Sequence, residues 1–178
     1  MTGLRACAAW LVLWGAVSAQ AGGEWSGTVT RIADGDTLWV RPAFGGRPVK
    51  LRVHGIDAPE ICQTGGQASR AALAHRLAGQ RVQVSPQRKD DYGRTVAVLH
   101  REGEDIAGWM VGQGHAWSYR FGRDGGPYRA QQAHAQASAR GLFADPLAVE
   151  PRLFRKRHGS CDPAGLAADV PSAAPAPG

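Results

Sequence analysis

The chain has 178 residues, with 21 lysines and arginines against 15 aspartates and glutamates, so its formal net charge is +6. This length suits one folded domain rather than several. A basic protein binds polyanions more often than average, although a merely soluble basic protein explains the charge equally well.

The two ends of the chain differ in composition from the part between them. Residues 1–21 carry one early cation, Arg5, then an apolar run that closes on small residues. This pattern predicts a cleavable secretory signal, with an uncleaved anchor as the alternative. Residues 162–178 are rich in alanine and proline and are expected to be disordered. The folded domain is therefore predicted over residues 22–161.

Three cysteines are present, and signal cleavage would remove Cys7 and leave Cys62 and Cys161. Two cysteines in an oxidising compartment predict one disulfide, whereas two free thiols are the alternative. A bridge closing this 99-residue separation would stabilise the fold by roughly 4–5 kcal/mol in the chain-entropy model. It would also hold the end of the domain beside Glu60. Two cysteines do not favour a structural zinc site.

Alternating apolar residues predict three strands between residues 24 and 56, because alternate side chains of a strand share one face. The inward residues are expected to be Val29, Ile32, Leu38, Val40, Val49, Leu51 and Val53. On the third strand Lys50, Arg52 and His54 would face outward. Turn sequences rich in aspartate or glycine separate the strands at residues 33–36 and 44–48.

The rest of the pattern predicts a helix, two strands and two more helices. The helix covers residues 67–77, and strands at 81–85 and 95–99 flank a polar loop at 87–94. Further helices are expected at 104–113, with Gly114 as its C-terminal cap, and from Pro127 to Gly141. This order predicts an α+β, mainly β fold, a five-stranded OB-type barrel with about three helices. Such barrels often bind oligonucleotides.

Ionisable residues gather at the strand ends and turns of this predicted barrel. They are Asp34 and Asp36 in the first turn, Arg52 on the third strand, Asp57 and Glu60 just after it, and Arg94. Each has an ordinary explanation by itself, such as a hairpin turn or a surface arginine. Together they are costly unless they are paired or bind a metal.

These residue types match the requirements of phosphodiester hydrolysis. That reaction needs a cation at the phosphate, a base for water and positive charge for the developing oxyanions. Carboxylate oxygens favour calcium or magnesium over zinc, and arginines bind phosphate oxygens in a bidentate manner.

Several motifs in the same order carry a resemblance to a known family. They are residues 34–37 (DGDT), Arg52 with 55–60 (GIDAPE), 91–94 (DYGR), 111–117 (VGQGHAW), 139–143 (ARGLF) and 151–156 (PRLFRK). Over residues 25–157 the sequence resembles the staphylococcal nuclease (thermonuclease) family. The resemblance implies an OB-fold nuclease that depends on Ca²⁺ and acts on DNA and RNA, leaving 3′-phosphate and 5′-hydroxyl ends.

The same resemblance implies a calcium site. Asp36 and Asp57 would be side-chain ligands, the main-chain carbonyl of Ala58 a third ligand, and Asp34 a member of the outer shell. It also implies three catalytic residues. Glu60 would act as general base or position the water, while Arg52 and Arg94 would bind the scissile phosphate and stabilise the transition state.

Substrate contacts are less well matched to the family pattern. Asp91 stands where the best-known family member has a lysine that holds a phosphate, so end-group preference is open. Tyr92 could hydrogen-bond a phosphate, and Trp117 or Tyr119 could stack on a base. Core packing is the alternative for Trp117.

Other charged residues add little to this interpretation. The six histidines show no metal-ligand spacing, and His54 reads as a solvated strand residue or a substrate contact. Residues 155–157 form a basic cluster that is either a solvated surface or a contact for a nucleic-acid backbone.

Three hypotheses follow. The first is a secreted or periplasmic calcium-dependent nuclease, a monomer that has no membrane contact after signal cleavage. The second is a non-catalytic OB-fold module that binds nucleic acid. The third is an exported basic protein that binds another polyanion, for which net charge is the sole support.

Overall fold

A computed structural model describes residues 23–120 and 124–161 of the chain. The expected signal segment and the expected disordered tail lie outside the described residues. Among the described residues, no helix combines the length and apolar composition needed to cross a membrane.

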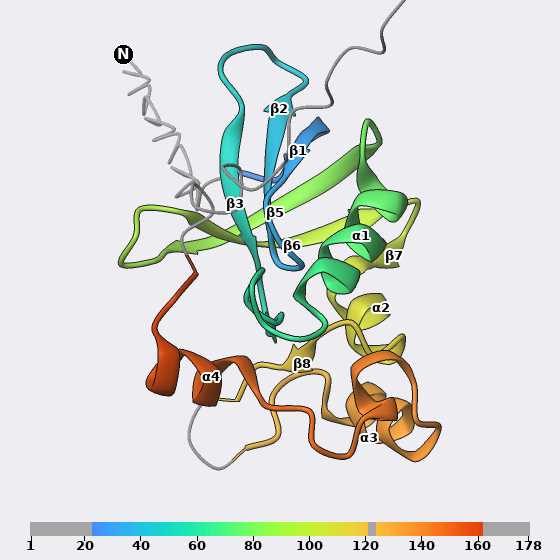
Figure 1. Cartoon of the computed structure of the whole chain (residues 1–178). Helices are drawn as coiled ribbons and strands as arrows, with labels where there is room; N and C mark the ends of the chain where they lie inside the picture. The colour runs from blue at the N-terminus through green and yellow to red at the C-terminus, as the bar shows by residue number, and fades with distance from the viewer. Residues whose placement is uncertain (1–22, 121–123, 162–178) are drawn as a thin grey trace, which may run out of the picture.

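A closed β-barrel forms the upper half of the molecule (Figure 1). Its sheet has the order β3-β2-β1-β5-β6-β7, and a parallel pairing of β3 with β6 closes the barrel. The strands are β1 Trp25–Ile32, β2 Thr37–Pro42, β3 Val49–Val53, β5 Arg81–Lys89, β6 Thr95–Arg101 and the short β7 Glu104–Asp105. Two further short strands, β4 Ile56–Asp57 and β8 Trp117–Ser118, pair with each other. The predicted five-stranded barrel is confirmed.

The core of the barrel includes most of the residues that the alternation predicted to face inward, whereas Val49 is only partly buried. Leu38, Val40, Leu51 and Val53 are at most 1% exposed. The residues between them, such as Trp39 and Lys50, therefore point outward, because successive side chains of a strand face opposite ways. This alternation also places Arg52 on the outer surface of β3.

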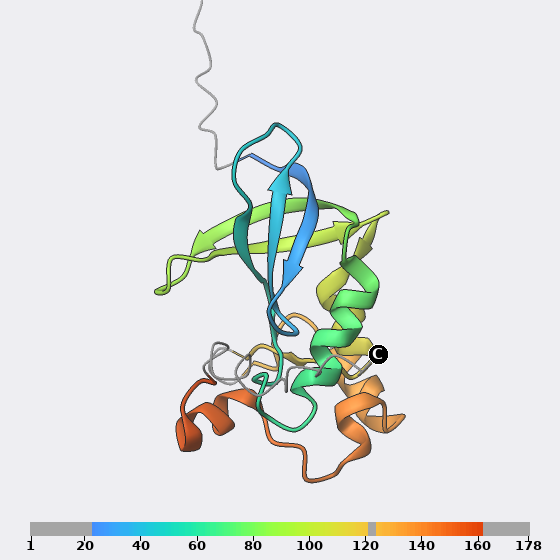
Figure 2. The same cartoon turned by 45° about the horizontal axis from the view of Figure 1, so that its top comes forward.

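In the part of the chain that the structure describes, four α-helices and one short 3₁₀ helix pack against one side and the lower end of the barrel (Figures 1 and 2). They are α1 Gly66–Leu77, α2 Ile106–Gly112, α3 Arg129–Ala137, η1 Gly141–Ala144 and α4 Pro151–His158. In both views α1 lies against one side of the barrel, while α2, α3 and α4 lie below it. Leu73 and Leu77 of α1 are fully buried in the core. The described residues thus contain four α-helices rather than the expected three or so.

Three predicted boundaries were wrong, each for a local reason. Residues 104 and 105 form β7 instead of helix, and Asp105 then caps α2 by accepting bonds from the backbone of Ala107 and Gly108. Strand β5 continues to Lys89, because its backbone remains paired with β6 beyond residue 85. The helix expected from Pro127 begins at Arg129 and ends at Ala137.

One glycine fixes the position of the first turn relative to α1. A side chain at Gly35 would overlap the hydroxyl of Ser69, on α1, and would lie 2.8 Å from the methyl group of Ala58. The turn between β1 and β2 therefore packs directly against α1 and the segment after β4. This contact brings Asp34 and Asp36 toward the residues that follow β3.

Candidate active site

Arg52 joins two buried carboxylates at the end of the barrel. Its Nη1 lies 2.6 Å from Oδ2 of Asp36, and its Nη2 lies 3.1 Å from Oδ1 of Asp57. Nη2 also donates to the carbonyl of Ile56 at 3.2 Å. Asp36 and Asp57 are each 5% exposed, so the guanidinium balances charges that water reaches poorly. The first turn and the residues after β3 thus meet through one arginine.

Asp36 is held as a carboxylate by several donors. Burial opposes its ionisation, but Arg52 and the hydrogen bonds from the Ala58 amide and Thr37 hydroxyl together lower its pKa below the ordinary value. The Ala58 amide donates to Oδ2 at 3.2 Å, and the Thr37 hydroxyl donates to Oδ1 at 2.9 Å. These hydrogen bonds, together with the short aspartate side chain, fix the orientation of the Asp36 carboxylate.

Asp34 and Asp57 experience the opposite shift. Burial and the charge of Asp36 raise the pKa of Asp34 to about 7. Burial also raises the pKa of Asp57, although Arg155 and Arg52 both favour its carboxylate form. The arginine partners therefore do not fully balance the negative charge of the three acids. An added cation would be favourable there.

Arg94 reaches the same place from the hairpin between β5 and β6. Its Nε lies 2.7 Å from Oδ2 of Asp90, and its Nη1 donates to the Thr37 hydroxyl at 3.3 Å. Because Thr37 in turn donates to Asp36, two hydrogen bonds link Arg94 to the carboxylate that holds Arg52. The two arginines predicted to bind one phosphate are thus brought together.

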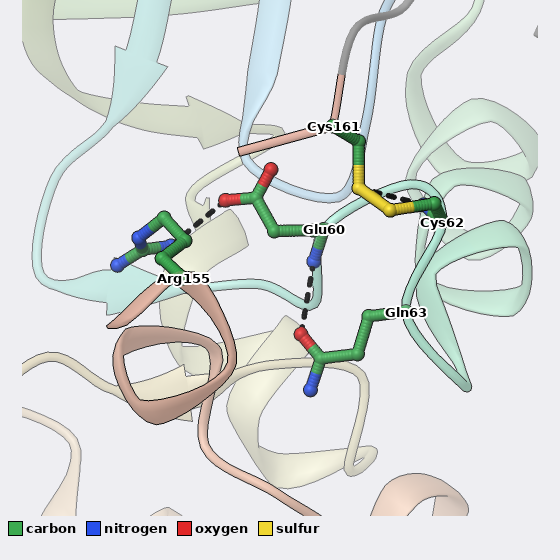
Figure 3. The surroundings of a disulfide bond; sticks show 5 residues. All are labelled: Glu60, Cys62, Gln63, Arg155 and Cys161. Atoms are coloured by element: carbon green, nitrogen blue, oxygen red, sulfur yellow. Dashed lines mark hydrogen bonds and ion pairs between the residues drawn. A yellow bond between two sulfur atoms is a disulfide. The ribbon is translucent and has the colours of Figure 1, made fainter. Parts of the chain in front are cut away.

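Glu60 follows β4 and lies beside an arginine that the sequence analysis did not assign to the site. Its Oε1 is 3.0 Å from Nη1 of Arg155, a residue of α4 (Figure 3). Arg155 also contacts Asp57, with Nη2 at 2.8 Å from Oδ2. Sequence reasoning placed Arg155 in a family motif and in a basic cluster, either solvated or in contact with a nucleic-acid backbone, but not beside Glu60. The signal that could have found it is Cys161, whose pairing with Cys62 brings α4 to Glu60.

A disulfide joins Cys62 and Cys161, whose Cα atoms are 5.9 Å apart (Figure 3). The Cys62 amide also donates to Sγ of Cys161 at 3.2 Å. This is the pairing expected from the sequence. It attaches the end of the described chain two residues after Glu60.

A groove of about 1170 Å³ runs over most of these residues, but Asp57 does not line it. The residues predicted for the site that line it are Asp34, Asp36, Arg52, Ala58, Glu60, Tyr92, Arg94 and Tyr119. Tyr92 is 83% exposed with Arg94 over its ring at 5.3 Å, and Tyr119 is 38% exposed. Trp117 is only 6% exposed and packs edge-on against Phe143, so the structure does not bring it to the groove.

The donor set determines which metal could be held. Among the described residues, no three acidic, histidine or cysteine side chains converge to hold a metal ion by themselves. A site built from the two carboxylates of Asp36 and Asp57 would therefore need a main-chain oxygen as well. The sequence analysis predicts the carbonyl of Ala58 for this role, and the structure shows that the Ala58 amide donates to Asp36. An all-oxygen set of this kind suits a hard cation such as calcium.

Sequence similarity places the chain in a known protein family. Residues 50–145 match the family model described as staphylococcal nuclease homologue. The chain belongs to the staphylococcal nuclease family. A Shigella flexneri protein named micrococcal nuclease is 37% identical over 169 residues, which cover 88% of this chain and 94% of the relative.

Other staphylococcal nuclease relatives are of similar size. Escherichia coli protein ParB is 38% identical over 164 residues, covering 86% of this chain and 90% of the relative. A Haemophilus influenzae protein named an uncharacterized endonuclease is 37% identical over 129 residues, or 72% of each chain. Membership of the staphylococcal nuclease family therefore extends over most of the described residues.

Proposed function

We propose that this protein is an exported, monomeric, calcium-dependent nuclease that hydrolyses phosphodiester bonds of DNA and RNA. The observation that carries the proposal is the hydrogen-bonded connection from Arg52 through Asp36 and Thr37 to Arg94. It sets two guanidinium groups along one groove beside the carboxylates and Glu60. The nuclease names of the family relatives support the same reaction class.

The two arginines keep donors free for a phosphate. A guanidinium has five N–H groups. Arg52 makes three contacts with the described residues and Arg94 makes two from its side chain. Their remaining N–H groups can bind non-bridging oxygens of the scissile phosphate and stabilise the charge that grows there during attack.

Glu60 is the base of the proposed reaction. Its carboxylate accepts a proton from the attacking water, or directs that water toward phosphorus. The water oxygen bonds to phosphorus as the bond between phosphorus and the 5′ oxygen breaks, and the leaving 5′ oxygen takes a proton from solvent. The products are a 3′-phosphate and a 5′-hydroxyl. Asp36, Asp57 and the carbonyl of Ala58 would hold calcium, with Asp34 in its outer shell. A calcium ion held there would supply positive charge beside the phosphate.

The substrate side chains of this proposal are Tyr92 and Tyr119. Both line the groove and are exposed, so each can contact a phosphate or a base of the bound strand. Trp117 is left out, because burial against Phe143 gives it a packing role.

The proposal is tested by digesting single-stranded DNA and RNA with the mature protein, in calcium and in excess chelator. Calcium-dependent cleavage with 3′-phosphate ends is expected. Binding without cleavage in both conditions would instead support the non-catalytic OB-fold module.

A variant pair tests the base assignment. Glu60→Gln should lower the cleavage rate by about 10²–10⁴ while keeping the fold, as judged by circular dichroism. Glu102→Gln is the matched control, because the Glu102 side chain is 79% exposed and lies in the turn between β6 and β7, away from the groove. Equal rates for the two variants would refute the role of Glu60.

A further inference from the structure

The turn that carries Glu60 is bracketed by the C-terminal segment, residues 149–161. At one end the Gln63 side chain donates to the carbonyl of Val149 at 2.6 Å, and at the other Cys62 forms the disulfide with Cys161. Arg155 lies between these attachments and contacts Glu60 directly (Figure 3). We call residues 149–161 the clamp.

Arg155 connects Glu60 with Asp57, the last residue of β4. Its Nη1 lies 3.0 Å from Glu60 and 3.2 Å from Asp57, and its Nη2 lies 2.8 Å from the other Asp57 oxygen. Among the described residues, Arg155 is the one side chain bonded to the carboxylate of Glu60. Glu60 itself stands on a turn outside any helix or strand. Its direction therefore depends on an arginine 95 residues away in the sequence.

We propose that Arg155 is a positioning residue, which holds the Glu60 carboxylate in its reactive direction while the clamp holds the turn. This inference rests on the proposed function for its kinetic part. Side chains that orient a reacting group can be worth about 10²-fold in rate, since an error of about 1 Å in position has that cost. An arginine suits the task, because one planar group bonds two carboxylates at once.

Kinetics of Arg155→Gln give the first test. We expect kcat on single-stranded DNA to fall about 10- to 100-fold, with KM changed by much less. Arg155→Lys should recover part of the rate, because its ammonium can contact one acid but cannot bridge both. Arg157→Gln, which removes the same charge from an exposed position of α4, is the matched control.

A double-variant cycle separates positioning from a structural role. In a Glu60→Gln background, Arg155→Gln should cause little further loss of rate, because the group it positions is gone. A merely structural arginine would cost the same factor in both backgrounds. Equal factors, or a wild-type kcat for Arg155→Gln, would overturn the proposal.

Hydrogen exchange tests the clamp without any activity. In metal-free protein, the amides of residues 60–63 should exchange faster in Arg155→Gln than in Arg157→Gln. This measurement decides the inference even if the wild-type protein cleaves nothing, a result that would refute the proposed function alone. Unchanged exchange would show that Arg155 does not hold the turn.

A second observation lies on the outer face of the barrel. Trp39 of β2 is paired with Arg31 of β1 and with Lys50 of β3, so the three side chains form a row across the sheet. Arg31 lies 4.7 Å and Lys50 5.2 Å from the centre of the Trp39 ring. The row is partly exposed to solvent and lines the same groove as Arg52.

The position of this row relative to Arg52 suggests what it binds. Thr37 and Arg52 stand two residues along from Trp39 and Lys50 on the same strands and the same face. Two residues of strand span about 7 Å. An aromatic ring flanked by cations is the combination with which proteins bind single-stranded nucleic acid, by stacking on bases and contacting phosphates.

We infer that the Arg31–Trp39–Lys50 row is a subsite for a nucleotide beyond the two that flank the scissile phosphate. Trp39 stacks on its base, and the two cations contact its phosphates. This inference also rests on the proposed function, since it extends the groove that the arginines define.

The subsite is tested by binding of fluorescein-labelled oligothymidylates in chelator, where cleavage is not expected. Trp39→Leu should bind an eight-nucleotide strand about 5- to 100-fold more weakly than the wild type, with little change for a two-nucleotide strand. Trp39→Phe, which keeps an aromatic face, is the matched control and should retain most of the affinity.

The charges of the row have a separate readout. Arg31→Gln should reduce the salt dependence of eight-nucleotide binding by about 0.7 in slope, whereas Arg70→Gln, at an exposed position of α1, should not. Wild-type affinity of Trp39→Leu, or an equal loss at both strand lengths, would overturn the subsite. Because no cleavage is measured, these outcomes are independent of whether the protein is a nuclease.

Discussion

Arg52 and Arg94 present the same guanidinium group to one groove, yet the fold holds them in different ways. Arg52 stands on β3 and bonds two carboxylates that are 5% exposed, from the turn after β1 and from β4. Arg94 stands at the end of the β5–β6 hairpin, which projects away from α1 in both views (Figures 1 and 2). Its ion pair is with Asp90, four residues earlier.

Arg52 therefore joins distant segments of the fold, whereas Arg94 is held mainly by a partner in its own hairpin. Removing Arg52 would leave buried acids from distant segments without a shared partner, which costs free energy of folding. Removing Arg94 would break a local pair and one 3.3 Å hydrogen bond to Thr37. Both losses affect the proposed chemistry, but only the first should affect the stability of the barrel.

The largest expected effect is that of Arg52→Gln. The rate should fall by about 10³–10⁵, as in other arginine-assisted phosphoryl transfers. The free energy of unfolding should also fall by about 3 kcal/mol, because Asp36 and Asp57 lose a buried partner. Cleavage assays and urea unfolding measure the two quantities, and a rate loss without a change in stability would contradict the first half of the comparison.

Arg94→Gln should match that loss of rate but not the loss of stability. We expect a fall of about 10³–10⁵ in rate and a change in unfolding free energy below about 1 kcal/mol, the usual range for a pair with a short local connection. The same two assays apply. Marked destabilisation would show that the hairpin supports the barrel.

Asp34→Asn, near Arg52, should remove part of the pH dependence of the protein's stability. Since burial raises the pKa of Asp34 to about 7, the folded protein keeps a proton that the unfolded chain has released. Stability therefore falls as the pH rises from about 4 to about 7, by about 2–3 kcal/mol between pH 5 and pH 8. Urea unfolding of metal-free protein at several pH values should show a flatter profile for the variant than for an Asp91→Asn control.

Asp90→Asn should have the smallest effect. Burial opposes ionisation of Asp90, but Arg94 and backbone amides lower its pKa, so it is charged at neutral pH. Its loss should reduce the cleavage rate up to about 10-fold by loosening Arg94, with little change in the urea midpoint. Asp91→Asn, in the same turn, is the control, and an equal loss there would mean that net charge rather than positioning matters.

The barrel, and the gathering of charged residues at its strand ends, follow from local sequence signals, whereas the roles of those residues rest on the family resemblance. Leu51 and Val53 alternate with Lys50 and Arg52, and this period of two fixes which side chains fill the core and which face outward. The continuation of β5 through Lys89 had no such signal, because its side chains are exposed and backbone pairing with β6 alone extends it.

Helix α4 and the role of Arg155 could not be read from local pattern. The helix has eight residues and one buried residue, Pro151, so it carries no apolar stripe. Tertiary contacts hold it in place. The ion pair of Arg155 with Glu60 and the nearby disulfide join residues 95 and 99 positions apart. For Trp117, the sequence left base stacking and core packing as alternatives, because an aromatic residue near a motif can have either role. Its burial against Phe143 supports core packing.

The disulfide between Cys62 and Cys161 also determines what a protease can do to this molecule. A single cut anywhere between the two cysteines opens the covalent loop without releasing a fragment, because the two pieces stay joined through sulfur. Arg94 and Arg155 then remain tethered to Glu60 even in a nicked chain. The damage becomes visible only on reduction, when one band on a gel separates into two.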